Sequence, residues 1–291
     1  MIVMRIHGGL GNQMFQYALG CRLAADRGCT FKMDIRSFEK DKLRHFALDC
    51  FQIDAPVATA DDIRQFGGGL NWHPRLRRLW TRLAGPSKRI IQERRFGFDP
   101  TVLGVPGNAY LYGYWQTEKY FLPASAAVRK VFQPRKPLSE RSQRLADEMA
   151  LPGTLSIHVR RGDYVASAVN EAFHNVCDPA WYKRALAEVC SRTDITRAYV
   201  FSDDIEWARS NLNLAVPCEF VPASPRELDF EDMVLMSCCQ HHIIANSSFS
   251  WWGAWLSDKT PSVVVAPARW FGPAGPTDTQ DICPDQWIKV N

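Results

Sequence analysis

Short apolar segments rich in β-branched residues alternate with helical patterns throughout the C-terminal half of this 291-residue chain. The predicted strands cover residues 154–160, 198–201, 218–221, 242–245 and 262–266. The predicted helices between them cover residues 180–190, 204–211, 228–240 and 249–257. Strands that are apolar on both faces and alternate with helices indicate a parallel sheet with helices on both sides. This half is therefore predicted to be a doubly wound α/β domain, which binds ligands at the carboxyl ends of its strands.

The N-terminal half begins with the same rhythm. A strand is predicted over residues 3–7, a glycine turn over 8–12, a helix over 13–26 and a second strand over 29–33. Residues 133–153 contain a Pro-Arg-Lys-Pro step followed by an amphipathic helix, which suits a linker. We therefore predict an N-terminal domain over residues 1–148 and a C-terminal domain over 149–291.

The charge, the apolar content and the cysteines of the chain limit which ligands and which cellular location we expect. A net charge of +4 and a pI near 8.6 suit an anionic ligand but are far from the basic extreme of nucleic-acid-binding proteins. The sequence contains no apolar run long enough to span a membrane, and its first residues lack the layout of a signal peptide. The nine cysteines include no CxxC pair, so we expect reduced thiols in the core. We predict a cytoplasmic protein with no nucleic-acid partner.

One basic segment permits two interpretations. Residues 75–95 carry eight Lys or Arg and one acid, interleaved with Trp and Leu. The segment is either a solvated basic face or a peripheral contact with the inner membrane surface or an anionic, lipid-linked acceptor.

The predicted strand 154–160 ends in two arginines, a glycine and an acid. Because alternate side chains of a strand share a face, His158 and Arg160 should point one way and Arg161 the other. The guanidinium group of arginine stays charged and binds phosphate oxygens in pairs. This strand end therefore predicts an anion-binding site, with Arg160 facing the ligand and Arg161 left for the domain interface or a structural ion pair.

Polar residues also follow two other predicted strands. After 198–201, Asp203 and Asp204 could accept hydrogen bonds from a purine or a ribose, although one of them is expected only to cap a helix. After 242–245, the backbone N–H groups and hydroxyls of Ser247 and Ser248 open a helix and could hold an anion. Phe249 could pack against a ligand ring. Together these motifs suit a nucleotide diphosphate.

The glycine turn at residues 8–12 lacks the G-x-G-x-x-G spacing of a dinucleotide loop. It either lets backbone approach a ligand, with the amides of Asn12 and Gln13 nearby, or is a purely structural turn. No cluster has the spacing of metal ligands, since His241 and His242 are adjacent and should face opposite sides of a strand. We predict that the ligand is held without a metal.

Four motifs resemble those of the family 11 glycosyltransferases, the α-1,2-fucosyltransferases of bacteria and animals. They are GGLGNQMFQY at 8–17, HVRRGDY at 158–164, FSDD at 201–204 and NSSFSWW at 246–252. The resemblance implies an α/β, GT-B-like fold of two Rossmann-like domains that face a central cleft. It also implies GDP-fucose as the donor, bound by the C-terminal domain, and an inverting, metal-independent transfer.

The same resemblance implies individual roles. Arg160 is expected on the β-phosphate, His158 near the ribose or guanine, and Asp203 on the guanine. The pyrophosphate turn corresponds to Ser247, Ser248 and Phe249, and the donor should be approached from the other domain by Gly11 and Asn12. The general base is left open among Asp163, His174 and Glu171. Asp163 could instead form a salt bridge that orients an arginine.

The predicted function is transfer of L-fucose from GDP-fucose to the 2-hydroxyl of a galactoside. The acceptor is a galactose-terminated glycan, free or lipid-linked, in the assembly of a surface glycan such as O-antigen. Two alternatives are kept. One is a glycosyltransferase of the same fold with another nucleotide sugar, and the other is a non-catalytic nucleotide- or glycan-binding module.

Overall fold

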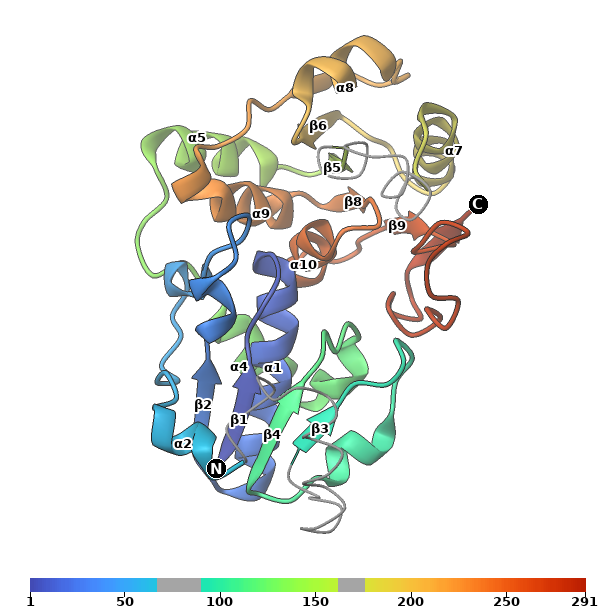
Figure 1. The fold of residues 1–291 in the computed structure, drawn as a ribbon. Coiled ribbons are helices and arrows are strands. Elements are labelled where there is room, and N and C mark those ends of the chain that lie inside the picture. Colours follow the sequence, from blue (N-terminus) through green and yellow to red (C-terminus); the bar gives the residue numbers. More distant parts are fainter. Residues whose placement is uncertain (67–89, 162–175) are drawn as a thin grey trace. The chain divides into compact units, whose positions relative to one another are not determined.

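The computed structural model describes residues 1–66, 90–161 and 176–291 (Figure 1). The chain divides into two compact units, Met1–Arg135 and Lys136–Asn291. The division lies before the boundary predicted after residue 148, because helix α5 (Glu140–Met149) belongs to the second unit.

A buried carboxylate attaches α5 to the second unit. Glu231 of α9 (Asp229–Cys238) accepts hydrogen bonds from the backbone N–H of Ser139 at 2.8 Å and from its hydroxyl at 2.7 Å. It also accepts one from the Ser142 hydroxyl at 2.6 Å. Burial alone would raise the pKa of Glu231, but these hydrogen bonds outweigh it and hold the pKa below its usual value. The start of α5 is therefore fixed to α9.

The second unit contains a sheet of six parallel strands in the order β10-β9-β8-β5-β6-β7. The strands are β5 (Thr154–Val159), β6 (Arg197–Ser202), β7 (Cys218–Phe220), β8 (His241–Ile243), β9 (Val264–Pro267) and β10 (Ile288–Val290). All five predicted strands are present, and β10 was not predicted. The order in which the strands are added reverses between β5 and β8: β6 and β7 extend the sheet on one side of β5, and β8, β9 and β10 extend it on the other. Open α/β sheets bind their ligands at such a switch point.

Helices cover both faces of this sheet, as the sequence predicts (Figure 1). On one face, α7 (Pro179–Cys190) and α8 (Ile205–Asn211) pack against Leu155, Ile157 and Val159 of β5. On the other face, α5 and α9 pack against Tyr199 and Phe201 of β6. Helix α10 (Ser248–Leu256) lies against α9 on this second face.

The first unit contains four parallel strands in the order β2-β1-β4-β3. They are β1 (Ile2–Arg5), β2 (Phe31–Asp34), β3 (Ile90–Gln92) and β4 (Ala109–Tyr112), of which only the first two were predicted. The α-helices in the described part of this unit are α1 (Leu10–Arg27), α2 (Ala60–Arg64) and α4 (Ser125–Val131). Short 3₁₀ helices of the two units are Arg36–Glu39, Leu48–Cys50, Pro100–Gly104, Glu118–Tyr120, Leu122–Ala124 and Arg226–Leu228.

Helix α1 packs closely on β1 and β2. Gly20 of α1 lies against the Phe31 ring of β2, and a Cβ atom at that position would overlap the ring. On the other face of the sheet, Val3 and Tyr110 pack with Ile63 of α2. Helices α1 and α2 thus cover opposite faces of the sheet that contains β1.

The cysteines differ in part from expectation. All nine are free thiols, but only Cys239 and Cys283 are buried, while Cys190 and Cys218 are exposed. Most of them therefore do not fill the core as predicted.

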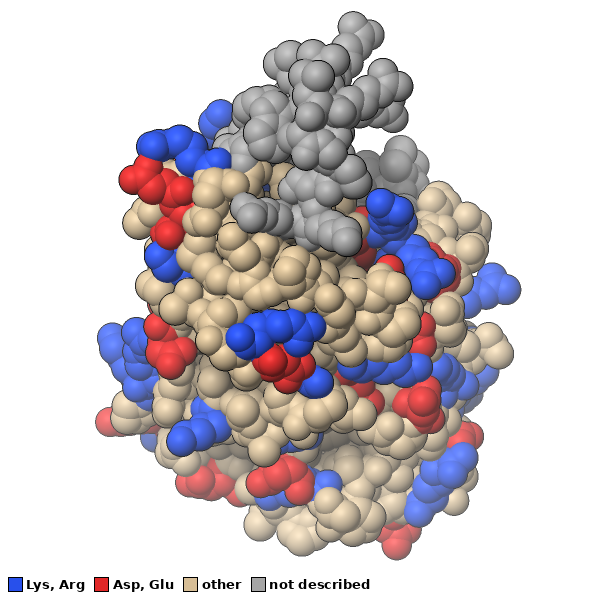
Figure 2. Space-filling model, turned by 90° about the horizontal axis from the view of Figure 1, so that it is seen from below, with Lys and Arg blue, Asp and Glu red and all other residues tan. Residues whose placement is uncertain are grey.

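Basic and acidic side chains are interspersed on the face drawn in Figure 2, without a broad patch of one sign among the described residues. Of the helices described, none combines the length and apolar character that crossing a membrane requires.

Candidate functional site

The carboxyl ends of β5 and β6 bring an arginine and an aspartate together. Arg160 directly follows β5, and its Nη1 atom lies 3.0 Å from Oδ2 of Asp203, which follows β6. The other oxygen of Asp203 accepts a hydrogen bond from the backbone N–H of Arg161 at 2.8 Å. The Arg160 and Asp203 side chains are about three-quarters buried, at 24% and 23% exposure. Asp203 therefore orients the guanidinium group at the end of β5.

Arg161 has a different environment, as the strand alternation predicts. Its guanidinium carbon lies 3.7 Å from the centre of the Trp207 ring on α8. Its Nε atom is 3.6 Å from Oδ2 of Asp204, which makes an ion pair but is too long for a hydrogen bond. Stacking of a guanidinium on an indole is favourable, so Arg161 anchors the loop after β5 to α8.

The two aspartates that follow β6, Asp203 and Asp204, make different contacts. Asp204 is the N-cap residue of α8, and its side chain accepts a hydrogen bond from the backbone N–H of Trp207 at 3.2 Å. This confirms that one of the pair caps a helix. The guanine-binding role of Asp203 stays a prediction, because one carboxylate oxygen of Asp203 contacts the Arg160 guanidinium and the other accepts the backbone N–H of Arg161.

His158 is a buried residue of β5. Its side chain is almost fully covered, and its Nδ1 atom has no hydrogen-bond partner in the described part of the chain. The ring centre lies 6.0 Å from that of Phe249 on α10. Burial, together with a smaller contribution from the charge of Arg160, lowers the pKa of His158 to about 3. The imidazole is therefore neutral near pH 7.

The start of α10 forms the second part of the site, at the end of β8. Ser247 is the N-cap residue, and its hydroxyl accepts a hydrogen bond from the backbone N–H of Phe249 at 3.3 Å. The N–H of Ser247 itself donates to the carbonyl of Ala245 at 2.8 Å, so it is not free for an anion as expected. The N–H of Ser248 has no acceptor among the described residues, and it lies in the first turn, where the helix dipole favours negative charge.

Asn246 connects this cradle to the next strand, a role that the sequence analysis missed. It is buried, and its Nδ2 atom donates to the carbonyl of Trp270 at 3.0 Å, beyond β9. Its Oδ1 atom lies 4.0 Å from the Cys177 thiol, just before α7. The cradle is thus fixed to the loop after β9.

In the first unit, glutamines hold the glycine turn after β1. Gln13 is fully buried and donates to the carbonyls of Gly8 at 2.9 Å and His45 at 2.8 Å. Its Oε1 atom accepts from the backbone N–H of Ala47 at 3.0 Å. The Gln13 amide therefore serves the turn rather than a ligand, which corrects one of the two interpretations of this motif.

Gln16 links the ends of two neighbouring strands. Its Oε1 atom accepts from the N–H of His7 after β1 at 2.9 Å, and its Nε2 atom donates to the carbonyl of Gly113 after β4 at 3.1 Å. Helix α1 begins at Leu10, three residues before the predicted start, so Gly11 and Asn12 lie in its first turn. Gln13 and Gln16 thus fix this end of α1.

Asn12 is held by a residue that follows β4. Its Oδ1 atom accepts a hydrogen bond from Nε2 of Gln116 at 2.6 Å. Nearby, Trp115 has a positive φ of 58°, which is uncommon for a bulky residue, and Glu93 accepts from its backbone N–H at 2.9 Å. Neither Gln116 nor Glu93 was singled out in the sequence, because no local pattern marks their contacts.

Several predicted positions lie outside the described residues. These are the three proposed bases, Asp163, Glu171 and His174, and most of the basic segment 75–95. Across residues 1–66, 90–161 and 176–291, no group of three or more His, Cys, Asp or Glu side chains is arranged to hold a metal ion.

The fold and the site define a class of protein. A doubly wound sheet that places an oriented arginine and a helix N-terminus at its switch point is an α/β domain suited to phosphate-bearing ligands. Residues 90–291 match the model of glycosyl transferase family 11. The chain belongs to this family, as the four motifs predict.

Similar proteins support the same assignment. The chain is 33% identical to an alpha-1,2-colitosyltransferase of Escherichia coli, over 100% of the chain and 99% of that protein. It is 28% identical to the O-antigen biosynthesis glycosyltransferase WbnK of Escherichia coli, over 98% of the chain and 99% of WbnK. It is 24% identical to the mouse galactoside 2-alpha-L-fucosyltransferase Sec1, over 88% of the chain and 64% of Sec1.

Solved structures show the same fold. The alpha-1,6-fucosyltransferase NodZ from Bradyrhizobium aligns with a TM-score of 0.51 and 15% identity, over 88% of this chain and 92% of NodZ. FUT1 of Arabidopsis thaliana aligns with a TM-score of 0.51 and 12% identity, over 100% of this chain and 76% of FUT1. The predicted GT-B-like class, with two Rossmann-like α/β domains, is confirmed.

Proposed function

We propose that this family 11 glycosyltransferase transfers L-fucose from GDP-fucose to the 2-hydroxyl of a galactoside, in the assembly of a surface glycan. The observation that carries the proposal is the ion pair between Asp203 and Arg160, the residue that follows β5. In the same unit, α10 begins after β8, the strand next to β5. A fixed cation and a helix N-terminus suit a diphosphate. Two of the relatives named above are, by their names, a colitosyltransferase and a fucosyltransferase, which supports a deoxysugar nucleotide as the donor.

Arg160 has a direct role in the proposed reaction. The 2-hydroxyl oxygen of the acceptor attacks the anomeric carbon of fucose from the face opposite the phosphate, and the bond from that carbon to the β-phosphate oxygen breaks. Negative charge grows on the β-phosphate as GDP leaves. A guanidinium group already oriented by Asp203 stabilises that charge more in the transition state than in the ground state. The N–H of Ser248 adds a second donor at the start of α10.

The hydroxyl proton passes to a base. Asp163 is the first choice because it lies three residues beyond Arg160 in the sequence, and His174 and Glu171 are the alternatives. His158 is an unsuitable base, since burial holds its pKa near 3. We propose that the transfer proceeds without a metal, with Arg160 and the helix N-terminus balancing the charge.

Colitose is the second candidate donor sugar. It is favoured by the 33% identity to an alpha-1,2-colitosyltransferase across the whole chain. A donor screen separates the candidates: the purified protein is incubated with lactose and either GDP-fucose, GDP-colitose or UDP-galactose, and nucleotide release is measured. Release from GDP-fucose supports the proposal, and release from GDP-colitose alone would assign the second candidate. Release from UDP-galactose alone, or from none with intact GDP binding, would favour another nucleotide sugar or a non-catalytic module.

We also propose that the acceptor is lipid-linked and that the protein meets it at the inner membrane face. The support is the basic, tryptophan-containing sequence at residues 75–95. Sedimentation with vesicles of phosphatidylglycerol tests this, with phosphatidylcholine vesicles as the control. Equal recovery in the supernatant with both vesicle types would contradict it.

A further inference from the structure

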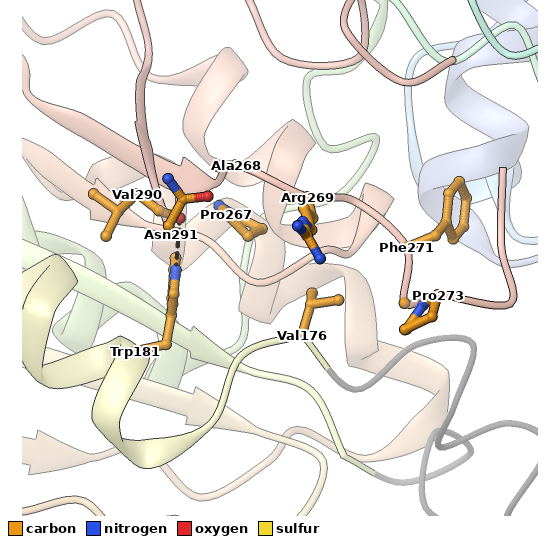
Figure 3. A pocket seen from close by; sticks show the side chains of 10 residues that line it. Val176, Trp181, Pro267, Ala268, Arg269, Phe271, Pro273, Val290 and Asn291 are labelled. Atoms are coloured by element: carbon orange, nitrogen blue, oxygen red, sulfur yellow. Dashed lines mark hydrogen bonds between the residues drawn. The ribbon is translucent and has the colours of Figure 1, made fainter. Parts of the chain in front are cut away.

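A pocket of about 480 Å³ opens at the carboxyl ends of β9 and β10 in the second unit (Figure 3). This volume is within the range of pockets that bind small molecules. Its walls are mainly apolar and include Val176, Trp181, Pro267, Phe271 and Pro273. Among the described residues that line it, Arg269 is the one with a charged side chain, and Figure 3 shows this side chain among the apolar groups. The site described above does not use this pocket.

The pocket adjoins the anion cradle at the start of α10. The cradle follows β8, and the pocket follows β9, which is the next strand of the sheet. Neighbouring strands are about 4.8 Å apart, close to the width of one sugar ring. A hydrogen bond links the cradle to the edge of the pocket, since Nδ2 of Asn246 donates to the carbonyl of Trp270, the residue after Arg269. A group attached to a phosphate at the cradle would therefore reach the pocket.

The order of the strands gives the direction of the ligand. Asp203, where the base is expected, follows β6, while the arginine and the helix that suit the diphosphate follow β5 and β8. The sugar of a nucleotide sugar is bonded to the β-phosphate, at the end remote from the base. We infer that the pocket after β9 binds the deoxysugar of the donor, with Arg269 donating hydrogen bonds to its hydroxyl groups. This inference rests on the proposed function.

The chemistry of the walls matches such a sugar. Fucose and colitose both carry a methyl group at C6, which gains by leaving water for a surface such as Val176 or Phe271. The guanidinium of Arg269 has five N–H donors and no ion pair or hydrogen bond with another described residue. Among the described residues that line the pocket, no side chain is acidic, so no acidic side chain among them competes with sugar oxygens for the donors of Arg269.

The first test separates the sugar from the nucleotide. Binding of GDP and of GDP-2-fluorofucose, a slowly transferred donor analogue, is measured by calorimetry for the wild type and Arg269→Ala. We expect the variant to bind GDP within about twofold of the wild type and the analogue at least about tenfold more weakly. Arg197→Ala is the matched control, because Arg197 pairs with Glu219 at the opposite end of β6.

The second test examines the apolar wall without a change in side-chain shape. Val176→Thr exchanges a methyl for a hydroxyl next to the proposed C6 methyl. We expect the preference for GDP-fucose over GDP-L-galactose, which carries a hydroxyl at C6, to fall about tenfold. Retention of the wild-type preference would contradict this placement of the methyl group.

The outcomes distinguish the inference from the proposed function. If Arg269→Ala weakens GDP and the analogue equally, Arg269 acts on the diphosphate and the inference is wrong. Unchanged binding of both ligands would also overturn it. Failure of the wild type to bind GDP would contradict the proposed function itself.

Discussion

Arg160 and Asp203 form an ion pair of 3.0 Å between the residues that follow two neighbouring strands, β5 and β6. The pair is about three-quarters buried, and its aspartate also accepts the backbone N–H of Arg161. The guanidinium group is thus positioned by a carboxylate that is itself fixed to the same loop. Such preorganisation matters where charge develops during a reaction.

Loss of the Asp203 charge should reduce turnover. Asp203→Asn keeps an oxygen that can accept the N–H of Arg161 but removes the charge that orients Arg160. We expect kcat/KM to fall about 10- to 100-fold, or about 1.4–2.7 kcal/mol of transition-state stabilisation. Steady-state assays with GDP-fucose measure this effect, and unchanged kcat/KM would refute the orienting role.

The same variant tests the guanine-binding role of Asp203. Inosine diphosphate lacks the exocyclic amine of guanine, so it loses that contact if Asp203 makes it. If Asp203 binds guanine, the ratio of GDP to inosine diphosphate affinity should be lower in Asp203→Asn than in the wild type. If the ratio is unchanged, Asp203 serves the arginine alone.

Lysine should not replace Arg160. A lysine keeps the positive charge but lacks the planar fork that can bind two phosphate oxygens and the Asp203 carboxylate together. We expect Arg160→Lys and Arg160→Ala each to lose more than about 100-fold in kcat. Single-turnover assays at saturating donor isolate the chemical step. Near-normal turnover in the lysine variant would show that bidentate contact is not needed.

Gln16 should contribute strongly to stability. Gln16→Met keeps the size of the buried side chain but removes the partners of the His7 N–H and the Gly113 carbonyl. Leaving the buried Gly113 carbonyl and the partly buried His7 N–H unsatisfied should lower the free energy of unfolding by about 2–5 kcal/mol. Urea denaturation measures this, with the exposed Gln143→Met as the control, which should stay within about 0.5 kcal/mol of the wild type. Equal stability of the two variants would argue against the role of Gln16.

The free energy of unfolding should decrease as the pH is lowered below about 6.5. Burial lowers the pKa of both His158 and His242 to about 3 in the folded protein. Below 6.5 the unfolded chain binds protons at these residues and the folded chain does not, so the free energy of unfolding decreases as pH falls towards 3. Each such histidine should contribute about 2 kcal/mol of loss between pH 7 and pH 5.

A double variant isolates the share of His242. His242 Nδ1 lies 2.8 Å from the Ser156 hydroxyl, so His242→Leu with Ser156→Ala removes both partners and leaves neither unsatisfied. Urea midpoints at pH 5 and pH 7 should then differ less than in the wild type. The same difference in both proteins would show that His242 is not a source of the pH dependence.

The strands that carry the arginine, aspartate and serine motifs could be predicted because β5, β6 and β8 are apolar and bounded by turns. β3, β4 and β10 were missed although they are as long as the predicted β7 and β8. No α-helix separates β3 from β4 or β9 from β10, so these strands lack the strand–helix alternation that marked the others. The Arg160–Asp203 pair depends on strand order and register, which no local pattern contains. The same holds for Gln16, whose partners are residues 7 and 113.

The measurement that tests the proposed function most directly is the NMR spectrum of the product formed from GDP-fucose and lactose by the purified protein. We predict a fucose in α linkage to O2 of galactose, produced by the wild type and nearly absent with Arg160→Ala. An α-linked fucose at another position, no product despite GDP binding, or equal product from the Arg160→Ala variant would contradict the account.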